Sequence, residues 1–331
     1  MSLTKNGTVK LADIEKASKR LAPYIKRTPI IRAEKVDGAA GCEVYFKPEN
    51  LQKTGSFKLR GATNKILSLS EEERGRGIIA SSSGNHGLGV ACASQLLGVQ
   101  ATLVLPVNAP KVKIEGARNM GANVILHGYD SVERYKRLYE IQAEEGYTLV
   151  HSYDDIDLIA GQGTVGYEIG EDFKDVDTVI VPLGGGGLLA GVATALKEMK
   201  PSVRVIGAEP AAIPRYSASR ERGEPVEVPM NDTVADGLMI TKTGGNTYPL
   251  IQKYVDEVIP VEDEFILKAM EHIYFDAKLV VEPSAAIGLA AILSGKIKTS
   301  PEEKVCCVLT GGNIDKEKLL KIFSKGEGEQ C

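Results

Sequence analysis

The chain has 331 residues, of which 43% are hydrophobic, so it can bury a large core as one large domain or as two. Its net charge is -4 with both signs mixed along the sequence, which excludes the basic surface of a nucleic-acid-binding protein and favours a small-molecule partner. No apolar run approaches the roughly 18 residues that a membrane-spanning helix needs, and the polar N-terminus lacks a signal-peptide core. The cysteines form no metal-ligand spacing, which indicates reduced thiols and a cytoplasmic protein.

Strands and helices are predicted to alternate from the first amphipathic pattern onward. Leu11, Ile14, Leu21 and Ile25 recur at helical spacing, which predicts a helix over residues 10–26. A short strand over residues 44–47 leads to a helix over residues 59–69. The next predicted elements are a strand over 77–81, a helix over 88–97, a strand over 101–105, a helix over 110–120, a strand over 123–126, a helix over 131–145 and a strand over 148–151.

The second half continues the same alternation. The predicted elements are a helix over 161–173, a strand over 178–182, a helix over 188–199, a strand over 203–208, a strand over 257–261, helices over 262–277 and 284–294, a strand over 305–309, and a closing helix from Asp315. Residues 213–247 are rich in Gly, Pro and Arg, which predicts an irregular functional loop. The alternation predicts an α/β fold with parallel sheets covered by helices on both faces.

A lysine in an apolar setting is the most unusual local feature of the chain. Lys58 stands between Phe57 and Leu59 in the stretch TGSFKLRG, where Gly55 and Gly61 let the backbone approach another group closely. Burial disfavours the ammonium form, and a neutral amine can attack a carbonyl to form a Schiff base. The alternative is a lysine whose stem packs while its ammonium group reaches water, and for a single lysine this alternative is the commoner case.

Glycine-rich turns follow three of the predicted strands, at residues 81–87 (SSSGNHG), 184–187 (GGGG) and 310–313 (TGGN). Ligands of open α/β sheets bind at the carboxyl ends of the strands, so these turns are expected to converge. Four glycines before a helix expose backbone N–H groups at a positive helix end, which suits a phosphate. The alternative is a tight packing turn. The pattern matches neither the dinucleotide-binding nor the P-loop motif.

Small polar side chains accompany two of these turns. Ser82, Ser83, Asn85 and His86 could hold a substrate carboxylate, or they could cap a helix. Thr310 offers a neutral hydroxyl at the end of a buried strand, and its alternative role is to cap the last helix. No cluster of metal ligands stands out in the sequence.

Together these motifs resemble the fold-type II pyridoxal-phosphate enzymes, which are tryptophan synthase β-like, and in particular the branch of threonine/serine dehydratases and serine racemases. The motifs GSFKLRG, SSSGNHG, GGGGL, ADG (235–237), EPS (282–284) and TGGN occur in the order and approximate spacing of that family. The resemblance implies two open parallel-sheet α/β domains with a cleft between them. Residues 1–74 and 149–331 would form a large cofactor-binding domain, and residues 75–148 a small mobile domain for the substrate carboxylate.

The resemblance also implies roles for individual residues. Lys58 would carry pyridoxal 5'-phosphate as a Schiff base and later remove the α-proton, with Phe57 packed near the cofactor ring. Asn85 would hydrogen-bond the pyridoxal 3-oxygen, and Thr310 would face the pyridine nitrogen. The cofactor phosphate would be bound by Gly184, Gly185, Gly186, Gly187 and Leu188. The substrate carboxylate would be received by Ser82, Ser83, Gly84, Asn85 and His86.

The activity implied is α,β-elimination, which converts threonine, serine or a related 3-hydroxy amino acid to a 2-oxo acid and ammonia. Ser83 favours an alternative, a serine racemase with side dehydratase activity, whereas the aliphatic Ile240 is typical of dehydratases. Arg134 lies one position from the carboxylate-binding arginine of the racemases. Glu209 matches a ligand of their divalent cation, but Arg215 stands where an acidic partner is expected, so no metal site is predicted.

Three further expectations complete the prediction. Family members form homodimers, so a homodimer is expected. The chain ends soon after TGGN, so no C-terminal regulatory domain and no feedback inhibition by isoleucine is expected. A more remote alternative is an α/β ligand-binding protein that kept the fold and lost the chemistry.

Overall fold

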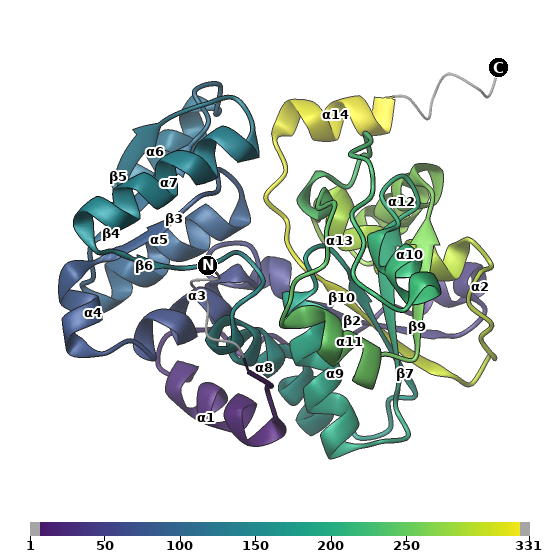
Figure 1. Ribbon diagram of the computed structural model, residues 1–331. Coiled ribbons are helices and arrows are strands. Elements are labelled where there is room, and N and C mark those ends of the chain that lie inside the picture. The colour runs from purple at the N-terminus through teal and green to yellow at the C-terminus, as the bar shows by residue number, and fades with distance from the viewer. Residues whose placement is uncertain (1–6, 325–331) are drawn as a thin grey trace.

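Two separate sheets carry the strands of the computed structural model, which describes residues 7–324 (Figure 1). The larger sheet has six strands in the order β1-β2-β10-β7-β8-β9, and only β1 runs antiparallel to its neighbour. Its strands are β1 (Ile31–Arg32), β2 (Glu43–Pro48), β10 (Lys304–Leu309), β7 (Thr178–Pro182), β8 (Arg204–Pro210) and β9 (Glu257–Val261). The fold is therefore the α/β class that the alternating pattern predicts.

Helices cover both faces of this six-stranded sheet, so its central strands are buried on both sides. In β7, Ile180 faces one apolar core, whereas Val179 and Val181 face the other. The first core is closed by α2 (Asp37–Ala40), α12 (Asp263–Glu271) and α13 (Pro283–Leu293). The second core is closed by α1 (Leu11–Leu21), α8 (Ile156–Asp172), α9 (Gly187–Met199) and α11 (Thr247–Tyr254).

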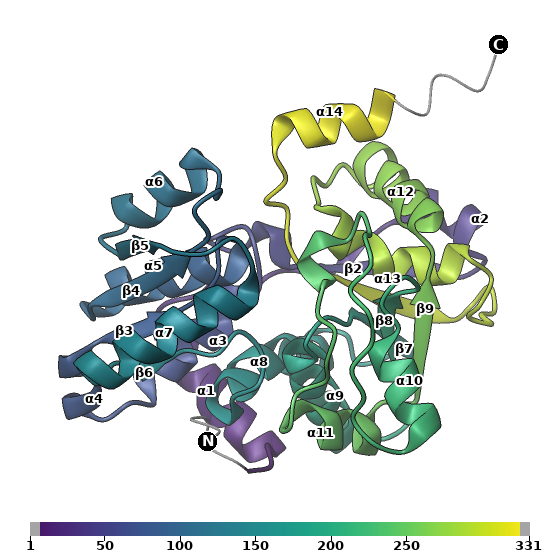
Figure 2. The same cartoon turned by 45° about the horizontal axis from the view of Figure 1, so that its top comes forward.

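The smaller sheet has four parallel strands in the order β5-β4-β3-β6, all of which come from the stretch between Ile78 and Leu149 (Figure 2). They are β5 (Asn123–Leu126), β4 (Ala101–Leu105), β3 (Ile78–Ala80) and β6 (Thr148–Leu149). One face packs against α3 (Lys58–Leu67), α5 (Asn85–Leu97) and α6 (Lys111–Asn119), and the other against α7 (Ser131–Glu145). α4 (Glu71–Arg76) leads into β3.

Glycines bring α3, α8 and α9 unusually close together. A Cβ atom at Gly161 of α8 would lie 2.8 Å from the Cα atom of Gly61 in α3. A Cβ atom at Gly191 of α9 would lie 2.6 Å from the backbone nitrogen of Gly163 in α8. Since real Cβ atoms do not approach that closely, glycine is required at these crossings. The crossing at Gly61, three residues after Lys58, thereby places α3 directly against α8.

Several predicted element boundaries are wrong, each for a local reason. α1 ends at Leu21 because Pro23 cannot continue the helix. α8 begins at Ile156, five residues before its predicted start, because the Asp155 side chain caps it by accepting from the N–H groups of Asp157 and Leu158. α12 ends at Glu271, and a single π-helical turn, η4 (His272–Asp276), follows it.

The segment 213–247, predicted to be irregular, contains three regular pieces. They are α10 (Arg215–Arg222), the short 3₁₀ helix η3 (Asp236–Leu238) and the first residue of α11. The closing helix is α14 (Lys316–Ser324). Among residues 7–324, no helix has both the length and the apolar character needed to cross a bilayer.

Candidate active site

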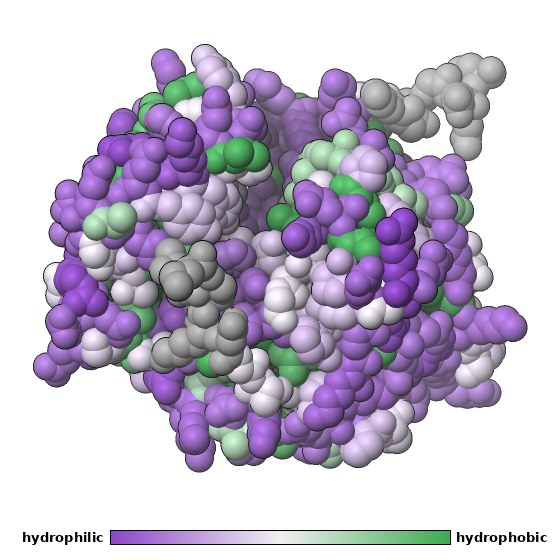
Figure 3. All heavy atoms as spheres, viewed as in Figure 1, coloured by the Kyte–Doolittle hydropathy of each residue, from purple (hydrophilic) through white to green (hydrophobic). Residues whose placement is uncertain are grey.

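A cavity of about 820 Å³ lies between the two sheets, where the carboxyl ends of β3, β7 and β10 meet. Figure 3 shows the molecular surface hollowed between the two halves at the top of the view. Every residue to which the sequence assigned a role lines this cavity: Phe57, Lys58, Ser82, Ser83, Gly84, Asn85, His86, Gly184, Gly185, Gly186, Gly187, Leu188 and Thr310. The three glycine-rich turns therefore converge, as the sequence led us to expect.

Lys58 is the first residue of α3, and its amine reaches into the cavity. The Nζ atom donates to the carbonyl oxygen of Ser152 at 2.7 Å and lies 5.3 Å from the centre of the Phe57 ring. Desolvation lowers the pKa of Lys58 from 10.5 to about 8, although the nearby Glu282 carboxylate opposes the shift. The neutral, nucleophilic form of the amine is therefore much more populated near neutral pH than for an ordinary lysine.

The stretch before Lys58 is pinned to the TGGN turn. Phe57 donates its N–H to the carbonyl oxygen of Thr310 at 3.1 Å, and Gly312 donates to the carbonyl oxygen of Gly55 at 2.9 Å. Thr310 directly follows β10 and is buried at the cavity wall. These bonds set the position of Lys58 relative to the Thr310 hydroxyl, which the sequence alone could not do.

The four-glycine turn links β7 to α9, whose first residue is Gly187. Gly186 has a φ of +90°, and a Cβ atom at Gly185 would overlap the Tyr153 ring, so both positions require glycine. A Cβ atom at Gly187 would lie 2.6 Å from the Tyr153 carbonyl oxygen. The N–H groups of the first turn of α9 have no partner within the helix and can bind an anion.

Asn85, the first residue of α5, is bound by two residues that lie next to elements of the six-stranded half, one before α13 and one after β10. Its Nδ2 atom donates to Glu282 Oε1 at 2.8 Å, and its Oδ1 atom accepts from Asn313 Nδ2 at 2.8 Å. Burial raises the pKa of Glu282 from 4.5 to about 7, against the hydrogen bond from Asn85. No role was predicted for Glu282 or Asn313, although Glu282 lies in the EPS motif and Asn313 in the TGGN motif.

The turn between β3 and α5 contains polar groups without a partner. Among the described residues, the buried Ser81 Oγ and His86 Nδ1 atoms neither donate nor accept a hydrogen bond. His86 Nε2 lies 2.9 Å from the Val150 carbonyl oxygen, and burial lowers the pKa of His86 from 6.5 to about 3. A neutral His86 that donates through Nε2 has no side-chain donor left for a carboxylate, so its backbone N–H is the group available there. Ser81 is an additional candidate that the sequence analysis missed.

Two residues that bear on the choice between a dehydratase and a racemase also belong to the cavity wall. Ile240 and Arg134 both line it. The Arg134 Nε atom is buried and makes no hydrogen bond among the described residues. Tyr153, for which the sequence predicted no role, packs its ring on Gly185 of the glycine turn and also lines the cavity.

Arg215 is fully buried beside Glu209, with 3.7 Å between Nη1 and Glu209 Oε2. Within residues 7–324, no group of three or more His, Cys, Asp or Glu side chains is arranged to hold a metal ion. The Arg215 guanidinium group thus occupies the position at which the resemblance to serine racemases implies an acidic ligand of a divalent cation.

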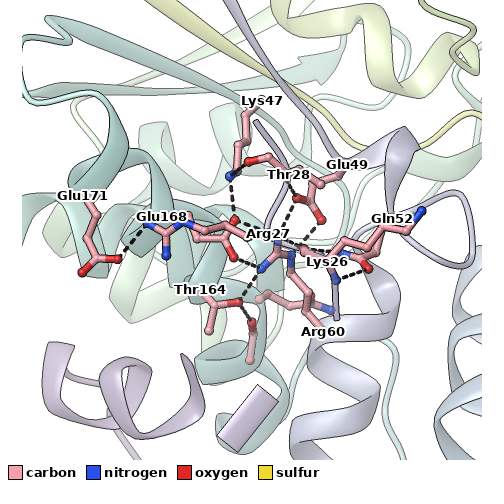
Figure 4. Close-up of polar contacts among 12 residues, drawn as sticks. Lys26, Arg27, Thr28, Lys47, Glu49, Gln52, Arg60, Thr164, Glu168 and Glu171 are labelled. Carbon is pink, nitrogen blue, oxygen red and sulfur yellow. Dashed lines mark hydrogen bonds and ion pairs between the residues drawn. The ribbon is translucent and has the colours of Figure 1, made fainter. Parts of the chain in front are cut away.

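A buried cluster of charges lies beneath the helix that carries Lys58 (Figure 4). Arg60 donates to Glu49 at 2.8 Å on both of its carboxylate oxygens and to Glu168 Oε1 at 2.6 Å, while Lys47 Nζ lies 2.6 Å from Glu168 Oε2. The two cations and two carboxylates are almost completely shielded from water. Because Arg60 lies two residues after Lys58 and Glu168 lies in α8, the cluster ties the start of α3 to α8.

Comparisons with known proteins agree with this geometry. The family model described as "Pyridoxal-phosphate dependent enzyme" matches residues 21–311. An L-threonine ammonia-lyase of Thermotoga maritima is 46% identical, over 96% of this chain and 79% of that protein. A catabolic L-threonine dehydratase of Staphylococcus aureus is 42% identical, over 96% of this chain and 93% of that protein.

Solved structures give the same result. Maize serine racemase superposes with a TM-score of 0.91 at 38% identity and covers 97% of this chain and 98% of its own. The processed form of threonine deaminase isoform 2 from Solanum lycopersicum gives a TM-score of 0.90 at 34% identity and covers 97% of this chain and 90% of its own. With its two α/β sheets and the lysine and glycine turn in the cleft between them, the chain belongs to the pyridoxal-phosphate dependent enzymes of fold type II.

Proposed function

We propose that the chain is an ammonia-lyase that converts L-threonine, L-serine or a related 3-hydroxy amino acid to a 2-oxo acid and ammonia by α,β-elimination. The observation that carries the proposal is the Lys58 amine, which shares one cavity with a glycine anion site and a polar serine turn. Relatives named threonine ammonia-lyase or threonine dehydratase, at 42–46% identity over nearly the whole chain, support the same activity.

The cavity residues fit pyridoxal phosphate on their own chemistry. Lys58 supplies a desolvated amine for the aldehyde, and Gly184–Gly187 with the first turn of α9 supply N–H donors for the phosphate. Phe57 supplies apolar surface for the ring, Asn85 an amide for its 3-oxygen, and Thr310 a hydroxyl for its nitrogen. When bound, the cofactor supplies an electron sink for the α-carbon of an amino acid.

The chain's own residues then perform the proton transfer and the binding. Lys58 removes the α-proton of the substrate as a neutral amine, which its lowered pKa favours. The carboxylate is held by Ser82, Ser83 and the backbone N–H groups of Gly84, Asn85 and His86, at the N-terminal end of α5. Ile240 gives the β-substituent an apolar wall, which accommodates the extra methyl group of threonine.

The two sheets would move relative to each other during the reaction. We assign residues 75–148 to a small mobile domain and residues 1–74 and 149–331 to a large domain, with the serine turn on the former and the glycine turn on the latter. Closure would bring Ser82–His86 onto the carboxylate and exclude water from the reacting carbon.

The test is a substrate panel on the cofactor-loaded protein. L-Threonine, L- and D-serine, threo-3-hydroxyaspartate and phenylserine are compared by the release of 2-oxo acid and by the enantiomer composition of the remaining amino acid. We expect oxo acid from at least one L-3-hydroxy amino acid, and loss of both activity and the visible Schiff-base absorption in Lys58→Ala. Failure of every substrate, with the absorption intact, would leave a binding protein rather than a lyase.

A serine racemase is the second candidate, because Ser83 lines the cavity and offers a second acid/base group. Serine racemases of maize and Dictyostelium discoideum are among the similar structures, at 38% and 39% identity. Enantiomer exchange faster than oxo-acid release in the wild type, abolished in Ser83→Ala while elimination survives, would favour this candidate.

We further propose that the protein is a cytoplasmic homodimer. Four of its cysteines, Cys42, Cys92, Cys306 and Cys307, are free thiols, which agrees with a reducing compartment, and the fifth, Cys331, lies outside the described residues. Sedimentation equilibrium of the purified protein tests the dimer.

A further inference from the structure

An arginine is buried directly behind the four-glycine turn. Arg215, the first residue of α10, has no exposed surface. Its guanidinium group donates to the carbonyl oxygen of Gly184 through Nε at 3.1 Å and Nη2 at 2.7 Å, to that of Leu183 through Nη2, and to that of Ile213 through Nη1 at 2.8 Å. Burial of a cation costs free energy unless its donors are satisfied, and here the guanidinium N–H groups are satisfied by backbone carbonyl oxygens.

The next carbonyl of the turn is held in the same direction. The hydroxyl groups of Tyr216 and Thr247 lie 3.1 Å and 3.0 Å from the Gly185 carbonyl oxygen and 2.8 Å from each other. Neighbouring side chains of α10 and α11 therefore fix three consecutive carbonyls, those of Leu183, Gly184 and Gly185.

A trans peptide is planar, and its N–H points opposite to its C=O. With the three carbonyls fixed toward α10, the N–H groups of Gly184, Gly185 and Gly186 point away from it. Gly184, Gly185 and Gly186 all line the cavity. Three successive N–H groups that face one side form a concave anion site, which continues into the first turn of α9.

The charge of Arg215 is only loosely paired. Glu209, at 3.7 Å, is much farther from it than Glu49 is from Arg60, at 2.8 Å. The Glu209 oxygens also accept the N–H groups of Tyr216 at 3.0 Å and Ser217 at 2.8 Å. A fixed positive charge thus stands behind the glycine turn, in surroundings where water screens it little.

We propose that Arg215, together with Tyr216, is a positioning residue for the cofactor phosphate: it orients the peptides of Gly184–Gly186 and places a fixed cation behind them. The inference deepens the proposed function, because it rests on the assignment of this turn to the phosphate. Arg215 does not touch the phosphate and acts through the backbone of the turn.

The test compares two aldehydes that differ only in the phosphate. The cofactor-free protein is titrated with pyridoxal phosphate and with pyridoxal, and Schiff-base absorption gives the dissociation constant of each. The variants are Arg215→Gln, Arg215→Lys and Tyr216→Phe. The matched control is Ser219→Ala in α10, which removes a buried hydrogen bond to the Arg215 carbonyl oxygen and one accepted from the Val226 N–H. Among the described residues, the Ser219 side chain makes no hydrogen bond to the turn.

We expect Arg215→Gln to weaken pyridoxal phosphate binding on the order of 10- to 100-fold, because the charge and most of the N–H donors are lost, while pyridoxal binding changes less than about threefold. Arg215→Lys keeps the charge and should recover part of the loss. Tyr216→Phe should show a smaller loss, also confined to the phosphate ester, and Ser219→Ala should match the wild type.

Equal losses for both aldehydes would overturn the proposal and leave Arg215 a purely structural residue. If Arg215→Gln does not fold, Arg215→Lys and Tyr216→Phe carry the same comparison. If the wild type itself binds the two aldehydes equally, the assignment of the phosphate to this turn fails, and that result is distinct from a failure of Arg215 alone.

Discussion

Lys58 shows how one buried position changes the chemistry of a common residue. It lies at the start of α3, beside the Phe57 ring, where desolvation favours the neutral amine. The stretch TGSFKLRG indicated a shielded lysine, but it could not separate that case from a lysine reaching water. Only the fold shows that the amine is desolvated and donates to the Ser152 carbonyl oxygen, and that this desolvation outweighs the opposing effect of the Glu282 carboxylate.

The lowered pKa predicts how the cofactor-free protein should react with the cofactor aldehyde. The neutral amine is the nucleophile, so the rate of Schiff-base formation should rise with pH and level off above about pH 8. Stopped-flow absorption over a pH series measures the midpoint. In Glu282→Gln the midpoint should fall further, because the carboxylate that favours the ammonium form is gone. A midpoint near the ordinary lysine value of 10.5 would contradict the prediction.

Glu282 gives a stability prediction of known sign. Its pKa is raised by burial from 4.5 to about 7, so the folded state keeps a proton that the unfolded chain loses. Stability therefore falls as the pH rises from about 4.5 to 7, by about 3 kcal/mol at most, and the cost persists above pH 7. Glu282→Gln keeps the acceptor for Asn85 and removes this cost. In the cofactor-free protein, the melting temperature of Glu282→Gln should exceed that of the wild type by more at pH 8 than at pH 4.5. An equal difference in melting temperature at the two pH values would refute the link between Glu282 titration and stability.

Among residues, the sequence predicted what lies within compact motifs and missed what depends on distant contacts. The residues of the three glycine-rich turns share one cavity because each turn follows a strand of a parallel sheet, a rule that can be applied to a sequence. Tyr153 packs on Gly185 and Asn313 binds Asn85 only after the chain has folded. The use of His86 Nε2 on the Val150 carbonyl was equally invisible.

At the scale of elements, strands were easier to predict than helix ends. β4, β5, β7 and β9 match their predicted ranges, because short apolar runs bounded by polar residues have little freedom of assignment. α4 and α10 were missed, because short charged helices lack an apolar period and form by capping and tertiary contact. The Asp155 cap of α8 was readable in principle, as an acidic residue before an apolar pattern.

The buried charge cluster beneath α3 should contribute most of the stability with which α3 is held against α8. Burial alone would raise the pKa of Glu49, yet the charge and hydrogen bonds of Arg60 hold it below its ordinary value. Arg60→Met leaves Glu49 and Glu168 short of a buried partner and should cost about 3–5 kcal/mol of unfolding free energy at neutral pH. The exposed pair of Arg27 with Asp172 is the control, and Arg27→Met should cost less than about 1 kcal/mol.

Urea unfolding of the cofactor-free variants measures both costs. A depressed carboxyl pKa stabilises the folded state above the unfolded value of 4.5, and that contribution is lost as the pH falls through the folded value. The difference in unfolding free energy between the wild type and Arg60→Met should therefore become smaller below pH 4.5. Equal losses of unfolding free energy in Arg60→Met and Arg27→Met would show that the buried cluster stabilises the fold no more than an exposed ion pair does.

At the scale of the whole molecule, the cavity is divided between the two sheets. The glycine turn and Thr310 follow strands of the six-stranded sheet, whereas Ser82–His86 follows β3 of the four-stranded sheet. Lys58 lies on α3, which packs against both α5 and α8. Asn85, bound by Glu282 and Asn313, makes polar contacts that bridge the two sides of the cavity. This arrangement suits a cofactor held on one side and a substrate closed in from the other.

That division predicts a two-step pattern of amide hydrogen exchange. Binding of pyridoxal phosphate to the cofactor-free protein should slow exchange at residues 184–188, because the phosphate occupies their N–H groups. Addition of L-alanine, which has no β-leaving group, should then slow exchange at residues 82–86 as the serine turn closes on the carboxylate. Mass spectrometry of peptic fragments resolves both segments, and a fragment from α12, remote from the cavity, serves as the internal control. Full protection of residues 82–86 by the cofactor alone would mean that the serine turn closes before any substrate is bound, and closure on the carboxylate would have to be abandoned.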